Sequence, residues 1–349
     1  MGIETSCDEC AAAVVEDGRN ILSNVVATQI PFHEAYAGVV PEIASRKHTE
    51  WITPVVKQAL EEAALEPQDL DGVAATAHPG LLGSLLVGLS FAKAFAWSLD
   101  KPFIALDHML AHLYAPRLVE SVEYPFLGLL VSGGHSIICR VDGFDDIAVL
   151  GTTIDDAVGE AFDKVSKHYG WGYPGGVHID RLSARGNPDA FRFPLPNLHK
   201  GEHRYDVSYS GLKTAAVNQL EQFRNKKSTG NAAAAETATG IGNSARAEDI
   251  AASFQKTAVE ILLRSLFRAV DDTGLKTVVA GGGVAANSYL RHRLAERTDL
   301  RCLFPPLELC GDNAAMIAGL GYQYLARGDR SGLNTTASAR VQAFKRRYP

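Results

Sequence analysis

The hydrophobic and polar positions of this chain follow two spacings, one typical of strands and one typical of helices. Short apolar runs bounded by turn residues predict strands at 11–15, 73–77, 102–106, 126–131, 137–141 and 277–280. Apolar residues three and four apart predict helices at 48–65, 155–169, 248–270 and 313–326, and one more from 287. Because the two kinds of segment alternate, the pattern predicts an α/β fold.

Two segments resemble each other and suggest an internal duplication. Residues 3–18 and 126–143 each contain a strand, a small polar turn, a second strand and an Asp-Gly pair. In both hairpins the turn can expose backbone N–H groups. A chain of 349 residues is also too long for one ordinary core, so we expect two domains or two duplicated halves, although two hairpins can resemble each other by chance.

Composition narrows the classes of protein to which the chain can belong. Hydrophobic residues make up 46% and charged residues 21%, as in soluble globular proteins. The longest apolar stretch, 80–97, contains Ser84, Ser90 and Lys93, so it predicts a buried helix and no membrane span; no signal peptide is expected. The net charge of -6 means that an RNA role needs a local basic patch or a partner.

Two local features allow more than one interpretation. The five cysteines suggest a reducing compartment, and Cys7 and Cys10 have the spacing of a redox or zinc pair. No second pair accompanies them, so the alternative is a turn that carries two thiols. The segment 225–247 is rich in Ala, Thr, Ser, Gly and Asn, which predicts a flexible surface insertion.

Two histidines one helical turn apart indicate a metal site. His108 and His112 share one helix face, and Asp107 precedes them as a candidate N-cap. A carboxylate from elsewhere in the fold would complete a site suited to non-haem iron or to zinc. Zinc proteases with this spacing need Glu directly after the first His, and here that position is Met109.

Three glycine-containing turns favour nucleotide binding. They are Ser132-Gly133-Gly134-His135 between two strands, Gly281-Gly282-Gly283 between a strand and a helix, and Gly175-Gly176 ahead of a helix expected at Ile179. Glycines let the backbone approach an anion and turn its amides toward it. One such turn has an ordinary structural explanation, whereas three at strand ends predict a nucleotide site.

An acidic helix lies between these turns in the sequence. Asp156, Glu160 and Asp163 are spaced to share one face. They form either a solvated stripe paired with Lys164 and Lys167, or carboxylates that face the ribose or a cation of a nucleotide.

Taken together, eight motifs in fixed order make this chain resemble one family. The motifs are IETSCDE (3–9), HMLAH (108–112), VSGGH (131–135), GEAFDK (159–164), YPGG (173–176), SGLKT (210–214), GGVAAN (282–287) and DNAAMIA (312–318). The chain resembles, over nearly its whole length, the bacterial TsaD family of tRNA threonylcarbamoyladenosine transferases.

The resemblance implies a fold and a reaction. The fold would be that of the actin-like ATPases (ASKHA), with two duplicated lobes, 1–112 and 113–349, around a ligand cleft. The reaction would transfer the threonylcarbamoyl group of threonylcarbamoyl-AMP to the exocyclic amine of the adenosine 3′ to the anticodon, in tRNAs that read codons beginning with A. AMP would leave. Implied partners are tRNA, a TsaB-like paralogue and a TsaE-like ATPase, in the cytoplasm and without a membrane.

The resemblance also assigns site residues. The metal ligands would be His108, His112 and Asp312, holding one divalent ion, Fe²⁺ or Zn²⁺. The substrate-binding residues would be Val131, Ser132, Gly133, Gly134, His135, Asp163, Gly176, Asp180 and Asn287. No residue is singled out as the general base.

The chain departs from the family pattern in places. His78-Pro79-Gly80 stands where Gly-Pro-Gly is common, which puts the rigidity of that turn in doubt, and Gly311 replaces a commoner Thr before Asp312. The first strand is expected to be short, because it begins near Gly2.

Three alternative functions fit the sequence less well. A metalloprotease lacks the Glu that would activate water, a non-catalytic scaffold would have lost metal ligands, and a sugar kinase would carry Asp-Gly-Gly-Thr phosphate loops that this sequence lacks.

Overall fold

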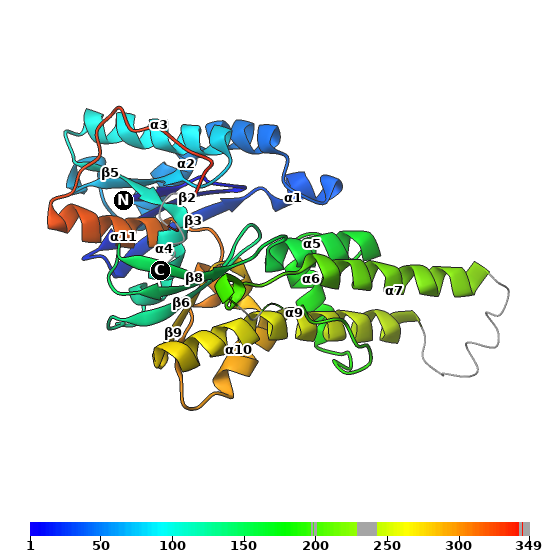
Figure 1. The fold of residues 1–349 in the computed structure, drawn as a ribbon. Helices are drawn as coiled ribbons and strands as arrows, with labels where there is room; N and C mark the ends of the chain where they lie inside the picture. Colours follow the sequence, from blue (N-terminus) through cyan, green and yellow to red (C-terminus); the bar gives the residue numbers. More distant parts are fainter. Residues whose placement is uncertain (197, 199–200, 229–242, 342–343, 345–349) are drawn as a thin grey trace.

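A computed structural model of the chain describes residues 1–196, 198, 201–228, 243–341 and 344. Its architecture consists of two five-stranded sheets, each covered by helices (Figure 1). The first sheet has the order β3-β2-β1-β4-β5 and contains β1 (Gly2–Glu4), β2 (Glu9–Glu16), β3 (Asn20–Thr28), β4 (Val73–His78) and β5 (Phe103–Asp107). The second has the order β10-β9-β6-β7-β8 and contains β6 (Phe126–Val131), β7 (Ser136–Val141), β8 (Ile147–Thr152), β9 (Thr277–Gly281) and β10 (Arg301–Leu303).

The two sheets have the same topology, which confirms the predicted duplication. In each, three consecutive strands pair antiparallel, a later strand pairs in parallel with the first of them, and one more pairs in parallel with that later strand. The predicted hairpins are β1–β2 and β6–β7. Every residue of β6 is buried, as expected for a strand covered on both faces.

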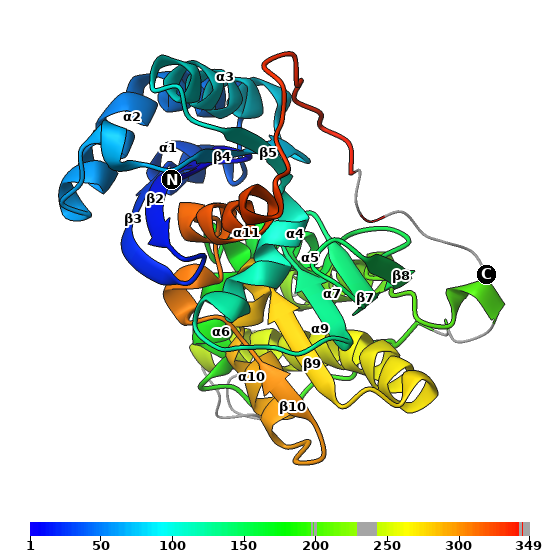
Figure 2. The same cartoon turned by 90° about the vertical axis from the view of Figure 1, so that its left-hand side faces the viewer.

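Helices cover the first sheet on both faces. On one side lie α2 (Pro41–Glu62) and α3 (Leu82–Ser98), and on the other lies α11 (Ala314–Arg327) (Figures 1 and 2). The approach of α11 is close because small residues line it: a Cβ on Gly321 would be 2.5 Å from the Cβ of Ala74. A helix from the end of the chain therefore completes the sheet that the N-terminus begins.

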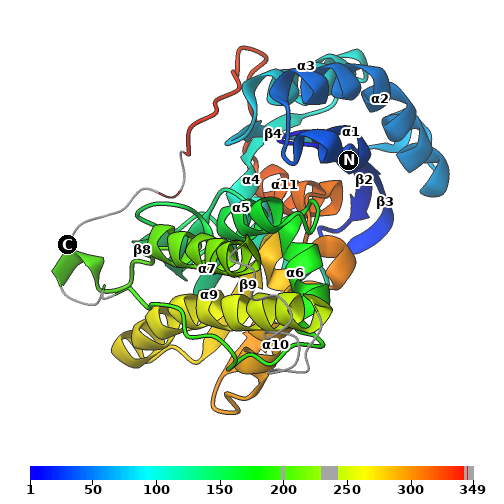
Figure 3. The same ribbon diagram turned by 90° about the vertical axis from the view of Figure 1, so that its right-hand side faces the viewer.

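The second sheet is covered by a separate group of helices. This group contains α5 (Val158–Tyr169), α6 (Gly175–Ser183), α7 (Ser210–Ser228), α9 (Asn243–Thr273) and α10 (Ser288–Ala295). Figure 3 shows α7 and α9 side by side. The short helices are α1 (Ile30–His33) and the 3₁₀ turns Glu34–Tyr36, Pro67–Asp69, Ala115–Leu118, Gly201–His203, Gly283–Ala286 and Leu307–Leu309.

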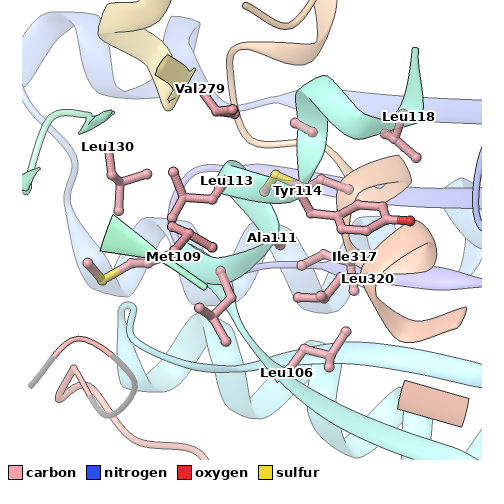
Figure 4. Close-up of a cluster of buried hydrophobic side chains, with 14 of the residues drawn as sticks. Leu106, Met109, Ala111, Leu113, Tyr114, Leu118, Leu130, Val279, Ile317 and Leu320 are labelled. Carbon is pink, nitrogen blue, oxygen red and sulfur yellow. The ribbon is translucent and has the colours of Figure 1, made fainter. Parts of the chain in front are cut away.

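Helix α4 (His108–Tyr114) is packed between the two sheets (Figure 4). Its side chains Met109 and Leu113 lie in one hydrophobic cluster with residues of β6, β9 and α11, among them Leu130, Val279 and Ile317. This burial holds the helix that carries both histidines at the junction of the two halves.

Three predicted boundaries were wrong. Helix α5 begins at Val158 and not at residue 155, because the preceding aspartates bond to α7 and to lysines. Helix α6 begins at Gly175, so the Gly-Gly pair is its first turn. The ends of the predicted insertion are helical: 225–228 continue α7 and 243–247 begin α9. The middle of that insertion, 229–242, lies outside the described residues.

No helix in the described ranges is long and apolar enough to cross a membrane. The apolar stretch 80–97 forms α3, as predicted, although Leu82, Leu86 and Trp97 are exposed on it.

Candidate metal and nucleotide site

The start of α4 is set by Asp107. Its Oδ1 accepts hydrogen bonds from the N–H groups of Met109 (2.8 Å) and Leu110 (3.1 Å), which caps the helix as predicted. Its Oδ2 is 3.1 Å from Nδ1 of His78. The cap makes His108 the first helical residue and places His112 one turn later on the same face.

Asp312 reaches both histidines from the turn before α11. Its Oδ1 is 3.1 Å from Nε2 of His112 and 3.4 Å from Nε2 of His108, and the two Nε2 atoms are 3.1 Å apart. Three donors each about 2.1 Å from one ion would be about 3.0 Å apart in octahedral and about 3.4 Å apart in tetrahedral geometry. The donor set therefore suits a single divalent ion.

Buried charge surrounds these three side chains. Burial lowers the pKa of His108, but Asp312 and Glu4 outweigh burial and raise it well above the usual range. Burial and the neighbouring His108 lower the pKa of His112. For Asp312, the two imidazoles overcome burial and lower the pKa strongly. Two carboxylates, those of Glu4 and Asp312, thus lie beside the same imidazole ring, that of His108.

The Ser132–His135 turn is tight and open to one side. Ser132 N–H donates to the His135 carbonyl (2.8 Å), and His135 N–H donates to Ser132 Oγ (3.2 Å). A Cβ on Gly133 or on Gly134 would meet nothing within 4 Å. Behind the turn, Gly159 N–H in the first turn of α5 donates to the Ser132 carbonyl (3.3 Å). A helix N-terminus therefore supports a turn with room for an anion.

A second glycine turn joins this loop to the metal helix. A Cβ on Gly281 would be 2.3 Å from the carbonyl oxygen of His112, and a Cβ on Gly282 would be 2.4 Å from that of Val131. Gly282 also has φ of 91°, in the region that favours glycine. The end of β9 thus lies against both the helix that carries the histidines and the start of the Ser132–His135 turn.

Of the predicted acidic face, only Asp163 faces the glycine turns. Its Oδ1 accepts a hydrogen bond from Gly175 N–H (2.6 Å), and burial raises its pKa to about 6. Asp156 lies before α5, so the shared helix face was wrong for that residue. Asp156 and Glu160 both pair with Lys164, as in the solvated alternative, whereas Lys167 instead donates to the carbonyl of Tyr36 (3.2 Å).

Asp180 and Asn287 come together near these turns. Asp180 Oδ1 accepts hydrogen bonds from Gln255 Nε2 (2.9 Å), Asn287 Nδ2 (3.3 Å) and Ser288 Oγ (2.7 Å). Asn287 also caps α10 through Leu290 N–H. A Cβ on Gly176 would meet nothing within 4 Å, so the turn of α6 is open beside them.

The structure adds residues that motif reasoning did not assign. Burial raises the pKa of Tyr173, and the negative charges of Asp8 and Glu9 raise it further. Asp8 also raises the pKa of Asp163. Burial raises the pKa of Glu9 well above its usual range. Glu4 lies 2.9 Å from His108 Nδ1. Their only signal in the sequence was the IETSCDE motif, in which no single role was evident.

The two alternatives raised for Cys7 and Cys10 can be compared with their positions. Cys7 lies in the turn after β1, and Cys10 is buried in β2. All five cysteines are free, and the one group of metal-type ligands found in the described residues is His108, His112 and Asp312. The turn therefore carries one of the two thiols, and the other belongs to a strand.

Comparison with solved structures reports on the fold. The chain is similar to full-length HypF, with a TM-score of 0.59 and 14% identity, covering 93% of this chain and 46% of that one. It is also similar to component A of the (R)-2-hydroxyglutaryl-CoA dehydratase of Acidaminococcus fermentans, with a TM-score of 0.52 and 13% identity over 93% and 98% of the two chains. With the duplicated topology, these matches confirm the actin-like ATPase fold.

Sequence comparison is more specific. Residues 20–319 match the family model described as TsaD, tRNA N6-adenosine threonylcarbamoyltransferase. Proteins of that name are 65% identical in Treponema denticola (99% of this chain, 98% of the relative) and 55% identical in Treponema pallidum (99% and 94%). Another, from Borreliella burgdorferi, is 48% identical (100% and 96%). The chain therefore belongs to the TsaD family of tRNA N6-adenosine threonylcarbamoyltransferases.

Proposed function

We propose that this protein transfers a threonylcarbamoyl group from threonylcarbamoyl-AMP to N6 of the adenosine 3′ to the anticodon, in tRNAs that read codons beginning with A. Family membership supports the transfer to tRNA adenosine. The observation that carries the proposal is the contact of one turn, Gly281-Gly282, with both the metal-ligand helix and the Ser132–His135 turn. A carbamoyl group bound at the metal ligands and a phosphate bound at the Ser132–His135 turn can then be parts of one small molecule.

His108, His112 and Asp312 would hold one divalent ion, Fe²⁺ or Zn²⁺. Both ions accept this donor set, and the separations of 3.1 to 3.4 Å suit either. When bound, the ion supplies Lewis acidity to the carbamoyl carbonyl. A protease mechanism is disfavoured, because Met109, where its base would stand, is 1% exposed and packed in the core.

The remaining residues would bind and orient the adenylate. The N–H groups of Gly133 and Gly134 would receive the phosphate and stabilise charge that develops on departing AMP, while Val131, Ser132 and His135 shape the turn around them. Asp163 and Asp180 would accept ribose hydroxyls; among the described contacts Asp180 Oδ2 accepts only a 3.4 Å bond from Ser288 N–H. Gly176 leaves room, and Asn287 holds Asp180 in place.

The transfer needs no covalent enzyme intermediate, because the carbamoyl group is already activated as an adenylate. The N6 amine attacks the carbamoyl carbon, the bond from that carbon to the phosphate oxygen breaks, and AMP leaves with the electron pair. The amine gives up one proton, which the phosphate of the departing AMP or a solvent water accepts. Orientation of the two reactants is the main contribution of the chain's residues.

Binding of tRNA would be shared with partners. The net charge of -6 is unfavourable for a polyanion, which supports a TsaB-like paralogue and a TsaE-like ATPase as partners in the cytoplasm.

Reconstitution tests the proposal. The protein, its partners, tRNA and synthetic threonylcarbamoyl-AMP are mixed, and digested tRNA is examined by mass spectrometry for the modified adenosine. We expect product with the wild type and a large loss with His112→Ala. Absence of product with the complete mixture would contradict the proposal, and equal product from both proteins would contradict the role of the metal centre.

A further inference from the structure

One carboxylate of the first sheet has no part in the function proposed above. Glu4 is the last residue of β1, the central strand of that sheet, and its side chain is 0% exposed. A buried carboxylate is costly unless each oxygen is bonded. Its position in a sheet core, where an apolar side chain would be expected, therefore needs a reason.

The side chain of Glu4 bonds to the turn after β1, to the neighbouring strand β4 and to His108. Oε1 accepts from Ser6 N–H (2.5 Å), and Oε2 accepts from Thr76 Oγ1 (2.5 Å) and lies 2.9 Å from His108 Nδ1. Ser6 Oγ is 3.2 Å from the same ring nitrogen. Among the described residues, no lysine or arginine pairs with Glu4, so the His108 ring is its cationic or N–H partner.

This contact determines which nitrogen of His108 can bind a metal. A carboxylate accepts hydrogen bonds and donates none when ionised, so Nδ1 must carry the proton. When the ring is neutral, as a metal ligand must be, its lone pair is then on Nε2, the atom that lies 3.1 Å from His112 Nε2 and 3.4 Å from Asp312 Oδ1. The ring is held between two carboxylates, one at each nitrogen.

The second histidine lacks this support. His112 Nδ1 is buried with no hydrogen-bond partner in the described part of the chain. Its ring is held by packing of α4 and by Asp312 at Nε2. The two ligands of one helix are therefore unequal, and His108 is the one with a defined tautomer.

We propose that Glu4 is a positioning residue of the metal centre: it holds His108 in the Nδ1-protonated form and directs Nε2 toward His112 and Asp312. A carboxylate behind an imidazole ligand also makes the ring a stronger donor, and loss of such a partner typically costs about tenfold to a hundredfold in metal affinity. This inference rests on the proposed metal centre. It links that centre to the middle of the first sheet.

The test measures metal binding and not turnover. Co²⁺ is titrated into the purified full chain and followed by visible absorption, with His112→Ala defining nonspecific binding. We expect Glu4→Gln to bind Co²⁺ about tenfold to a hundredfold more weakly than the wild type. Gln keeps the size of the side chain, but its amide N–H₂ faces either Ser6 N–H or the Nδ1–H of His108.

A matched control separates positioning from general loss of stability. Asp206 is also a buried carboxylate (1% exposed) that accepts from a backbone N–H, of Thr152, and contacts a histidine Nδ1, of His203. Asp206→Asn disturbs the second half of the molecule in the same chemical way, and we expect its Co²⁺ affinity to equal that of the wild type.

A second variant covers the case in which Glu4→Gln does not fold. Thr76→Val removes one hydrogen bond from Glu4 Oε2 at constant size, and we expect an affinity between those of Glu4→Gln and the wild type. In protein with ¹⁵N-labelled histidine and bound Zn²⁺, the wild type should show a hydrogen-bonded Nδ1–H for His108, which shifts in either variant.

The outcomes distinguish this inference from the proposed function. Wild-type affinity in Glu4→Gln, or in Thr76→Val if that alone folds, with an unchanged His108 Nδ1–H signal overturns the role of Glu4 and leaves the metal centre intact. Failure of the wild type itself to bind Co²⁺ above the His112→Ala background overturns both.

Discussion

A single added methyl group at Gly281 should disturb the metal centre by displacing the backbone of His112. In Gly281→Ala the new Cβ would lie 2.3 Å from the carbonyl oxygen of His112 and 2.8 Å from its carbonyl carbon. The carbonyl oxygen and carbon of His112 are backbone atoms, so no side chain can rotate away from the new Cβ. Even a tight contact of about 3.0 to 3.4 Å therefore requires β9 and α4 to separate by about 0.7 to 1.1 Å. Metal ligands tolerate displacements of about 0.5 Å, so His112 would leave its place beside Asp312.

Two magnitudes follow from that displacement. Overpacking of this kind costs about 1 to 3 kcal/mol of folding free energy. A misplacement of about 1 Å in a reacting constellation can cost about a hundredfold in rate. We therefore expect Gly281→Ala to lower the urea midpoint modestly and to reduce threonylcarbamoyl transfer and Co²⁺ affinity much more strongly than its stability loss explains.

Gly283→Ala provides the control for this experiment. It lies two residues away in the same turn, and a Cβ there would meet nothing within 4 Å. We expect it to match the wild type in urea unfolding and Co²⁺ titration. The reasoning is refuted if Gly281→Ala binds Co²⁺ like Gly283→Ala, since the His112 backbone would then have moved without consequence or not at all.

Three other perturbations test separate parts of the structure. Asp107→Ala removes the cap of α4 and should cost about 0.5 to 2 kcal/mol in urea unfolding, together with a loss of Co²⁺ affinity; unchanged affinity would show that the cap does not position His108. Asp163 is protonated more readily when folded, with a pKa of about 6 against 3.8, so its contribution to stability is present below pH 3.8 and is lost as the pH rises through 6. Asp163→Asn should therefore gain stability relative to the wild type, by up to about 3 kcal/mol between pH 4 and pH 7, and a pH-independent difference between their urea midpoints would contradict this. Asp155 accepts hydrogen bonds from Tyr209 and Ser210 N–H at the start of α7, so Asp155→Ala should cost about 0.5 to 2 kcal/mol and expose α7 to limited proteolysis, whereas an unchanged cleavage pattern would argue against that cap.

Reconstitution without partners adds a test of the assembly. The isolated chain should be weakly active, because its charge of -6 opposes binding of tRNA. Full turnover by the purified protein alone, measured by mass spectrometry of the tRNA, would be the contrary result.

Local patterns were enough to predict most elements of this fold. The period of the apolar residues predicted the hairpins β1–β2 and β6–β7 and the long helices, because burial of one face imposes that period wherever the chain folds. The spacing of His108 and His112 placed two imidazoles on one helix face, and Asp107 predicted where the helix begins. Such features depend on residues within a few positions of one another.

Features that depend on distant segments could not be obtained in this way. Asp156 was expected on the face of α5 with Asp163, yet it precedes the helix because Lys213, from α7, bonds to it. Helix α11 covers the sheet that the first strand begins, and no local pattern indicates such a partner 300 residues away.

The amino-acid sequence by itself determined the repeated α/β organisation, the pair of histidines on one helix and, through its ordered motifs, the family. Only the tertiary structure decided the distances at which Asp312, a ligand that the ordered motifs implied, meets those histidines, that Glu4 contacts one of them, and that a glycine turn joins the ligands to the candidate phosphate loop. The reason is physical: spacing along the chain governs which side chains share a face, whereas the packing of whole sheets and helices governs which faces meet.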